Sequence, residues 1–251
     1  MGLLRGFGIF MLLIIILMGV SGCMKDELPQ QPTKKENKAK EAEMLTYLKD
    51  KYKQEFTSVE YIPAKRGFND GYNKNILIAK SEDRILVNVR EKLVTPGKFY
   101  DDFLNSYASK LVEGAIDYGE IEKLQTAKTF ITLKADNNNV NEFNNGEFAL
   151  TNEKISSRIC VISISDAADE EVLKELYDVY KQMYLLADNG NTLVAAFSGD
   201  KNKAERYVNN YLLYGVQRWE NYDDSVKEIL RIQQKGLSFE QFKEQLVIVG
   251  G

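Results

Sequence analysis

The sequence contains no histidine among its 251 residues. This absence excludes Ser-His and Cys-His nucleophilic pairs, zinc sites with imidazole ligands, and general-base catalysis by histidine. Any catalytic chemistry would have to use carboxylates, lysine or tyrosine, so a carboxylate-based hydrolase is the enzyme class that stays open. We predict that the protein is not an enzyme and that it needs no cofactor and no metal.

Cysteine is nearly absent as well, since the chain has only Cys23 and Cys160. Cys160 lies within the apolar run Ile159–Ile162. Free cysteine is commonly buried as a small apolar side chain, and a reactive thiol needs a neighbour that lowers its pKa. We therefore expect Cys160 to pack in the core.

The chain also lacks an excess of positive charge, because 33 basic side chains stand against 37 acidic ones, for a net charge of −4. Nucleic-acid-binding proteins usually present a basic surface. The composition therefore predicts no nucleic-acid partner. The length is sufficient for one or two domains, each with a hydrophobic core.

Charged side chains are scarce at the amino terminus, where Arg5 is the only one in residues 1–22. An apolar run from Phe7 to Val20 follows it. A membrane-spanning helix needs about 20 apolar residues, so this run is short for a span and suits the core of a signal peptide. The positive charge precedes the run, which is the polarity expected for export.

The apolar run ends in Val20-Ser21-Gly22-Cys23. This motif resembles the lipobox of bacterial lipoproteins, in which an aliphatic residue and two small ones precede an obligatory cysteine. The resemblance covers about the first tenth of the chain. It implies that residues 1–22 are a lipoprotein signal peptide, that cleavage falls between Gly22 and Cys23, and that the Cys23 thiol carries diacylglycerol. An ordinary cleaved signal peptide and an uncleaved anchor are the alternatives.

The same resemblance implies a location on the extracytoplasmic face of the cell membrane, anchored through lipid on Cys23. Two acyl chains are sufficient for stable anchoring, whereas a single chain is marginal. Abundant asparagine, lysine and isoleucine favour a bacterium with a single membrane. With Cys23 lipidated, Cys160 has no cysteine left with which to form an intramolecular disulfide.

The polar, proline-containing residues 23–40 have almost nothing to bury, and we predict a flexible tether. A tether of this length has an average reach of about 20 to 25 Å, which keeps the remainder near the membrane. Residues 41–251 are predicted to be a globular α+β region. A division into two subdomains, at about 41–125 and 126–251, stays open.

Hydrophobic periodicity predicts the elements of the first half. A helix is expected at about 40–55, followed by a strand at 57–62 and by two strands at 75–80 and 84–90 that form a small antiparallel meander hairpin. A helix at 96–114, a strand at 129–134 and a polar loop at 136–146 come next. The segment 65–75 contains two glycines and three asparagines and is predicted to be a loop.

The second half is predicted to contain a β-α-β-like unit. Strands at 157–165 and 192–197 flank a helix that Asp166 could cap. Three helices are then expected at about 201–214, 225–235 and 239–247, and Ser238 with Gln241 forms a capping box for the last one. The predicted fold class is α+β, with several helices flanking the meander and the β-α-β-like unit.

An aromatic row is one candidate ligand site in the sequence. Tyr207, Tyr211 and Tyr214 share one side of the helix predicted at 201–214, and Trp219 follows closely. Aromatic rows can stack on sugars, and an exported protein meets the cell wall. The neighbouring apolar stripe that includes Val208 gives the helix a wide apolar face, so packing in the core is the alternative.

The asparagine-rich segment that begins at Asp136 invites comparison with a calcium-binding loop. In a 12-residue EF-hand register, Asn141 would occupy the position that requires glycine. The match fails, and we expect a solvated loop.

Two further acidic motifs receive structural interpretations. Asp200, within Ser198-Gly199-Asp200-Lys201, is expected to cap a helix, because its charge would repel the phosphate that such a loop could bind. Asp101 and Asp102 are adjacent on a predicted helix and point in different directions, so we expect surface charges.

Taken together, these features predict a membrane-anchored extracytoplasmic lipoprotein that acts as a non-catalytic binding or interaction module of the cell envelope. Its partner would be an envelope protein or the cell wall. The alternative is a small-ligand receptor for wall fragments or peptides, supported by the tyrosine row and by the loop at 67–75.

Overall fold

The computed structural model describes most of the chain after residue 30. The described residues are 31–64, 74–92, 95, 97–119, 121–136, 138–165, 167–186, 190–209, 211 and 219–249. The predicted signal peptide, Cys23, Tyr214 and most of the 67–75 loop lie outside these residues. Among the helices of the described part, none is long and apolar enough to cross a membrane.

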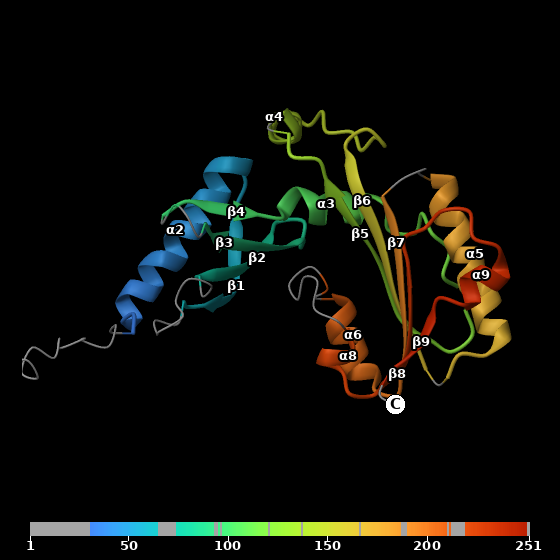
Figure 1. The fold of residues 1–251 in the computed structure, drawn as a ribbon. Coiled ribbons are helices and arrows are strands. Elements are labelled where there is room, and N and C mark those ends of the chain that lie inside the picture. Colours follow the sequence, from blue (N-terminus) through green and yellow to red (C-terminus); the bar gives the residue numbers. More distant parts are fainter. Residues whose placement is uncertain are drawn as a thin grey trace, which may run out of the picture.

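The first half of the chain forms a four-stranded antiparallel sheet in the order β1-β2-β3-β4. Its strands are β1 (Phe56–Ile62), β2 (Ile76–Ser81), β3 (Leu86–Glu91) and β4 (Phe99–Asp101). The antiparallel pair β2 and β3 confirms the predicted meander hairpin, and β1 is the strand predicted at 57–62. In Figure 1 these strands lie beside the blue helix α2 (Lys34–Tyr52).

Helix α2 begins about six residues earlier than the sequence predicts, so residues 34–40 of the predicted tether are helical. The cause is a capping box: the Thr33 side chain accepts a hydrogen bond from the Glu36 N–H at 3.2 Å, and Glu36 accepts one from the Thr33 N–H at 2.6 Å. These two bonds satisfy free donors of the first turn.

One face of the first sheet packs against α2. Met44 and Leu48 of the helix are fully buried against Leu77 and Val87, whose side chains alternate with outward-facing ones along β2 and β3. The opposite face of this sheet is not covered by α2, and it forms one wall of the cleft described below.

The second half forms a five-stranded sheet in the order β5-β6-β7-β8-β9. Its strands are β5 (Leu124–Leu133), β6 (Ile155–Ile164), β7 (Asn191–Ser198), β8 (Val226–Ile232) and β9 (Leu246–Ile248). Strands β6 and β7 are parallel and are joined through α5 (Glu170–Leu186), which confirms the predicted β-α-β unit. The other pairs are antiparallel.

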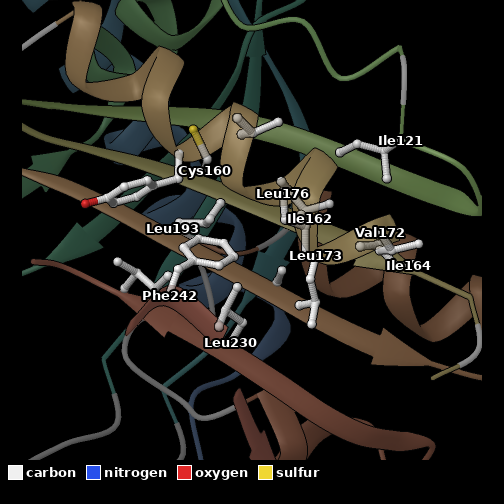
Figure 2. Close-up of a cluster of buried hydrophobic side chains, with 14 of the residues drawn as sticks. Ile121, Cys160, Ile162, Ile164, Val172, Leu173, Leu176, Leu193, Leu230 and Phe242 are labelled. Atoms are coloured by element: carbon white, nitrogen blue, oxygen red, sulfur yellow. The ribbon is translucent and has the colours of Figure 1, made fainter. Parts of the chain in front are cut away.

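Helices cover both faces of this second sheet, which explains why its central strands are apolar throughout. On the α5 side, Cys160, Ile162 and Leu193 pack against Leu176 of α5 (Figure 2). Phe242 of the short helix α9 (Phe239–Lys243) closes the same core. The other face is covered by α6 (Lys201–Asn209) and α8 (Trp219–Tyr222).

Two predicted helices near the carboxyl terminus are wrong in whole or in part. Within the helix predicted at 225–235, residues 226–232 form strand β8, because this β-branched segment fills the place beside β7 and buries Ile229 and Leu230 on opposite faces. In the range 239–247, only α9 is helical, and β9 then pairs with β8. The predicted Ser238–Gln241 capping box is confirmed.

The helix predicted at 96–114 is shorter, because residues 99–101 pair with β3 as strand β4 before α3 (Phe103–Leu111) begins. The loop predicted at 136–146 contains helix α4 (Asn138–Asn144). Its residues Val140 and Phe143 pack onto the core of the first sheet, so the segment is not a freely solvated loop. The α+β fold class is confirmed.

Candidate functional site

A cleft of about 660 Å³ separates the two sheets. We call it the inter-sheet cleft. Its walls are the uncovered face of the first sheet, one side of α3 and the edge strand β5. Residues from all three walls line it, among them Ile78, Leu86, Asn88, Asp102, Ser106, Lys110, Ala127, Lys128 and Thr129.

Helix α3 joins the two sheets by covering one half of the β5 edge. The Ile131 N–H donates a hydrogen bond to Ser109 Oγ at 2.8 Å, and the Leu133 N–H donates to Asn105 Oδ1 at 2.9 Å. Two polar side chains of α3 thus replace the missing neighbour strand. An exposed strand edge carries unpaired backbone groups, and covering it in this way is a common protection.

The other half of the β5 edge lies open in the cleft. Along an antiparallel strand, the backbone groups of alternate residues point away from the partner strand. Ile131 points its N–H away from β6, and the register runs without a shift from Thr126 to Thr132. The N–H groups of Ala127 and Thr129 therefore point the same way, and neither has a hydrogen-bond partner among the described residues.

The opposite wall of the cleft combines apolar and amide groups. Ile78, Leu86 and Asn88 lie on the face of the first sheet that points away from α2. The Leu86 side chain is 50% exposed, although it belongs to a regular strand. The wall therefore offers apolar surface that this chain leaves open, beside the polar group of Asn88.

Asp102 places a carboxyl group in the cleft wall at the start of α3. Its two oxygens accept hydrogen bonds from the Asn88 N–H at 2.7 Å and from Asn88 Nδ2 at 2.6 Å. Burial raises the pKa of Asp102, and the two bonds from Asn88 act in the opposite direction. The side chain is held rigidly and is not the surface charge that the sequence predicts.

The neighbouring Asp101 is also buried rather than at the surface, with a side-chain exposure of 0%. Its carboxylate accepts hydrogen bonds of 2.6 Å from the hydroxyls of Tyr47 and Tyr52 and from Lys51 Nζ. Burial and the charge of Asp101 raise the pKa of both tyrosines. Asp101 therefore fastens α2 to the sheet, and its oxygens are not available to a ligand.

Lys128 brings a positive charge to the β5 wall. Its Nζ lies 5.4 Å from the centroid of the Phe130 ring, within range of a cation–π interaction. Loss of water around the amine lowers the pKa of Lys128, and the charge of Glu113 acts in the opposite direction. Lys110 and Asp83 add charges of both signs to the lining.

The residues of the predicted aromatic site do not form one exposed surface. Tyr207 and Trp219 are both 0% exposed, and their rings stack with a centroid distance of 4.5 Å. Tyr211 is partly buried and stacks on Phe130 at 5.5 Å. Tyr214 lies outside the described residues. Tyr207 and Trp219 thus form the core beneath α6, where their faces are not open to a sugar.

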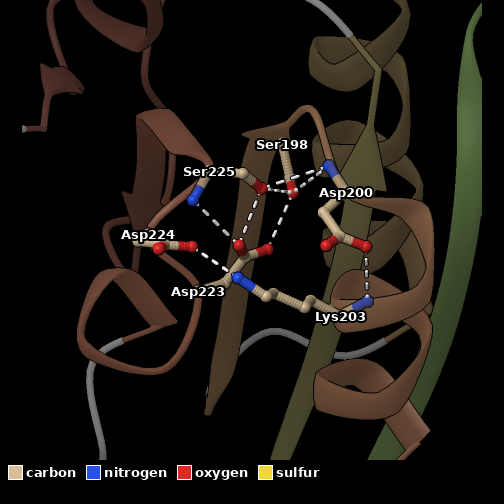
Figure 3. Close-up of polar contacts among 6 residues, drawn as sticks. All are labelled: Ser198, Asp200, Lys203, Asp223, Asp224 and Ser225. Carbon is tan, nitrogen blue, oxygen red and sulfur yellow. Dashed lines mark hydrogen bonds and ion pairs between the residues drawn. The ribbon is translucent and has the colours of Figure 1, made fainter.

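The polar motif that begins at Ser198 forms an internally satisfied cluster (Figure 3). The fully buried Asp223 accepts hydrogen bonds of 2.7 Å from the hydroxyls of Ser198 and Ser225. Asp200 accepts one from the Lys203 N–H at 3.1 Å, which confirms it as the helix cap. These groups are engaged with one another, so the cluster fixes the β7–α6 connection.

Cys160 is 0% exposed and burial raises the pKa of its thiol, as expected for a cysteine that packs in the core. Thr129 Oγ1 lies 3.7 Å from its sulfur and 2.7 Å from the Tyr118 hydroxyl. Among the described residues, no group of three acidic or thiol side chains is placed to hold a metal ion.

Sequence reasoning missed the cleft because its polar groups come from separate segments. Asn105 and Ser109 look like ordinary polar positions on a helix, and nothing in the sequence shows which β5 amides point outward. Asn88, an amide that alternates with the apolar residues of a meander strand, was the one available signal.

Comparisons with known proteins find little similarity. No protein-family model matches the chain, and no curated protein matches it. A crystal structure of a DUF5037 family protein from Ruminococcus gnavus aligns with a TM-score of 0.44 and 13% identity, over 82% of this chain and 98% of that one. At this level, the likeness carries no argument about function.

Proposed function

We propose that the protein is a lipid-anchored, non-catalytic binding module of the cell envelope, and that its inter-sheet cleft holds an extended peptide segment of an envelope partner. The observation that carries this proposal is the open half of the β5 edge, where Ala127 and Thr129 direct their backbone groups into the cleft.

An extended peptide can add a strand to such an edge. Backbone hydrogen bonds then provide affinity, and contacts to alternate side chains provide specificity. The volume of about 660 Å³ lies within the usual range of ligand-binding clefts, about 300 to 1,000 Å³. Ile78 and Leu86 on the opposite wall supply apolar surface for the peptide side chains.

The mixed charge of the lining supports a peptide over a strongly charged ligand. Lys110 and Lys128 provide positive groups, while Asp83 and Glu113 provide negative ones. The backbone of a peptide is neutral and needs only local complementarity. Tyr207 and Trp219 are buried in the core and cannot stack on a sugar, so the main argument for a sugar ligand is lost.

The peptide site can be tested with the detergent-solubilised full-length protein. Peptides of about 12 residues selected from a random library should include binders in extended conformation. Ala127→Pro removes a single N–H that faces the cleft. It takes no hydrogen bond away from β6, because this N–H points away from β6. Proline is tolerated at such outward positions of edge strands.

We expect Ala127→Pro to weaken peptide affinity at least tenfold, and Ala127→Ser, which keeps the N–H, to retain it. The fluorescence of Trp219, the only tryptophan, reports whether each variant is folded. Equal affinity of both folded variants, or selection of binders only outside the cleft, would count against the proposal.

The anchoring part of the proposal rests on the lipobox ending at Cys23. Cells that express the protein should incorporate labelled fatty acid into it. The variant Cys23→Ser should carry no label, and its chain should be either released from the membrane or left unprocessed. Persistent labelling of that variant would refute lipidation at this residue.

A further inference from the structure

Arg158 is a buried arginine whose Nη1 has no hydrogen-bond partner among the described residues. It lies on β6, with Ile131 of β5 on one side and Asn191 of β7 on the other, and it is 4% exposed. Within the described part of the chain, no group accepts a hydrogen bond from its Nη1 and no carboxylate forms an ion pair with it.

Such an arrangement is costly. An arginine side chain stays protonated in proteins, so it cannot escape burial by losing its charge. A buried charge that lacks a counter-charge is strongly destabilising, and a buried polar group without a partner requires an explanation, such as a bound ion. The position of Arg158 therefore favours the binding of an anion at its guanidinium group.

Arg158 lines a small pocket beside the inter-sheet cleft, with a volume of about 160 Å³. We call it the Arg158 pocket. Thr129 and Asn152 are the other polar side chains of the lining. The remaining residues are apolar: Val112, Ala115, Ile116, Leu150, Ile155 and Leu186.

Size and chemistry together restrict the ligand. A cavity of about 150 Å³ can hold a molecule as large as benzene, so the Arg158 pocket has room for about six non-hydrogen atoms. The planar guanidinium fork matches a carboxylate, to which it can donate two parallel hydrogen bonds. Leu150 and Ile155 offer an apolar surface, which a fully hydrated inorganic anion would not use.

We propose that the Arg158 pocket binds a carboxylate on a short apolar stem, with the carboxylate paired to Arg158 and the stem against Leu150 and Ile155. This site goes beyond the proposed peptide cleft and does not depend on it. The carboxylate can come from a free short-chain acid or from the carboxyl terminus of a chain that ends in a small apolar residue.

The first test uses the full-length protein without substitutions. Butyrate and its neutral analogue butyramide are titrated while backbone amide shifts of Thr129, Asn152 and Arg158 are recorded by NMR. Acetyl-Gly-Gly-Val as the free acid and as the amide tests the chain-terminus source. At least one acid should shift these amides saturably, and its amide analogue should bind at least tenfold more weakly.

Two results of this titration would overturn the proposal. One is that neither acid shifts these amides, and the other is that acids and amides bind alike. Inorganic phosphate is titrated as a further probe. If phosphate saturates the site and both carboxylates fail, the ligand class is wrong.

Variants of Arg158 test the role of the guanidinium. Arg158→Met should abolish carboxylate binding while leaving the melting temperature of the ligand-free protein unchanged or higher, because it removes an unpaired buried charge. Arg158→Lys keeps the charge without the fork and should lose at least tenfold in affinity. Arg231→Met, in the same sheet but paired with Glu220, is the control and should bind as wild type does.

A different outcome with Arg158→Met would contradict the account. If the variant loses a large part of its stability and carboxylates do not stabilise the wild-type protein, then another part of the chain supplies the counter-charge. Loss of carboxylate binding with peptide binding intact would separate this site from the inter-sheet cleft.

Discussion

Ser109 provides a quantitative test of how the β5 edge is protected. Its hydroxyl accepts a hydrogen bond from the buried Ile131 N–H at 2.8 Å, and its O–H donates one to the Asn105 carbonyl at 2.7 Å. Ser109→Ala leaves the Ile131 N–H buried and unsatisfied, and a lost partner of this kind costs about 1 to 3 kcal/mol. Alanine also favours helix by about 0.5 kcal/mol over serine, which offsets part of this loss.

Ser106→Ala, one turn earlier on α3, isolates the hydrogen-bond effect, because it makes the same change in helix propensity while the Ser106 hydroxyl has no hydrogen bond to any of the described residues. The difference in free energy of unfolding between the two variants should therefore be about 1 to 3 kcal/mol. For a chain of this size, each kcal/mol lowers the melting temperature by about 2 to 4 °C.

Urea unfolding followed by the fluorescence of Trp219 measures this difference, because the single tryptophan, on α8, is fully buried against the second sheet. Loss of the Ser109 bond should lower the urea midpoint and leave the slope of the transition unchanged. Two variants whose free energies of unfolding differ by less than about 0.5 kcal/mol would refute the view that α3 side chains satisfy the β5 edge.

Two further predictions follow from buried titratable groups. Burial raises the pKa of Asp102, so its contribution to stability is fully present below the unfolded pKa of about 3.9 and is lost as the pH rises through the folded pKa. Relative to Asp102→Asn, which stays neutral, the wild-type free energy of unfolding should fall as the pH rises above about 4, and a constant difference in urea titrations would contradict this. Burial also raises the pKa of the Cys160 thiol, so a disulfide reagent should label Cys160 in native protein no faster than the chain unfolds; rapid labelling at neutral pH would show that the thiol is accessible.

Sequence patterns were sufficient where local signals agree with the fold. The strands at 76–81 and 86–91 alternate between core and open face, and the parallel pair around α5 is apolar on both faces. The Ser238–Gln241 capping box is local chemistry and was visible directly. The equivalent box at Thr33 and Glu36 was also readable, and it places the start of α2.

The misassigned elements depend on distant neighbours. The apolar residues of 226–232 fit helical spacing as well as a strand buried on both faces, and only the vacant position beside β7 decides between them. Residues 99–101 pair with β3 because tertiary contacts hold Asp101 between Tyr47 and Tyr52. Such contacts override local propensity.

The candidate sites were harder to predict than the elements, because they depend on the register of paired strands and on how distant segments of the chain pack together. Which β5 amides face outward depends on the pairing of β5 with β6, and a shift of one residue would reverse it. Arg158 appears in the sequence as one polar residue ahead of an apolar strand. Only the packed structure reveals that it is buried, unpartnered and beside a pocket.

Hydrogen exchange of the β5 amides tests the central claim, that the inter-sheet cleft binds an extended peptide through the free edge of β5. Exchange would be measured on the full-length protein with and without a saturating, library-selected peptide. We expect the amides of Ala127 and Thr129 to exchange at least tenfold more slowly in the complex, while Ile131, already bonded to Ser109, changes little. Protection elsewhere on the protein, with Ala127 and Thr129 unchanged, would contradict it.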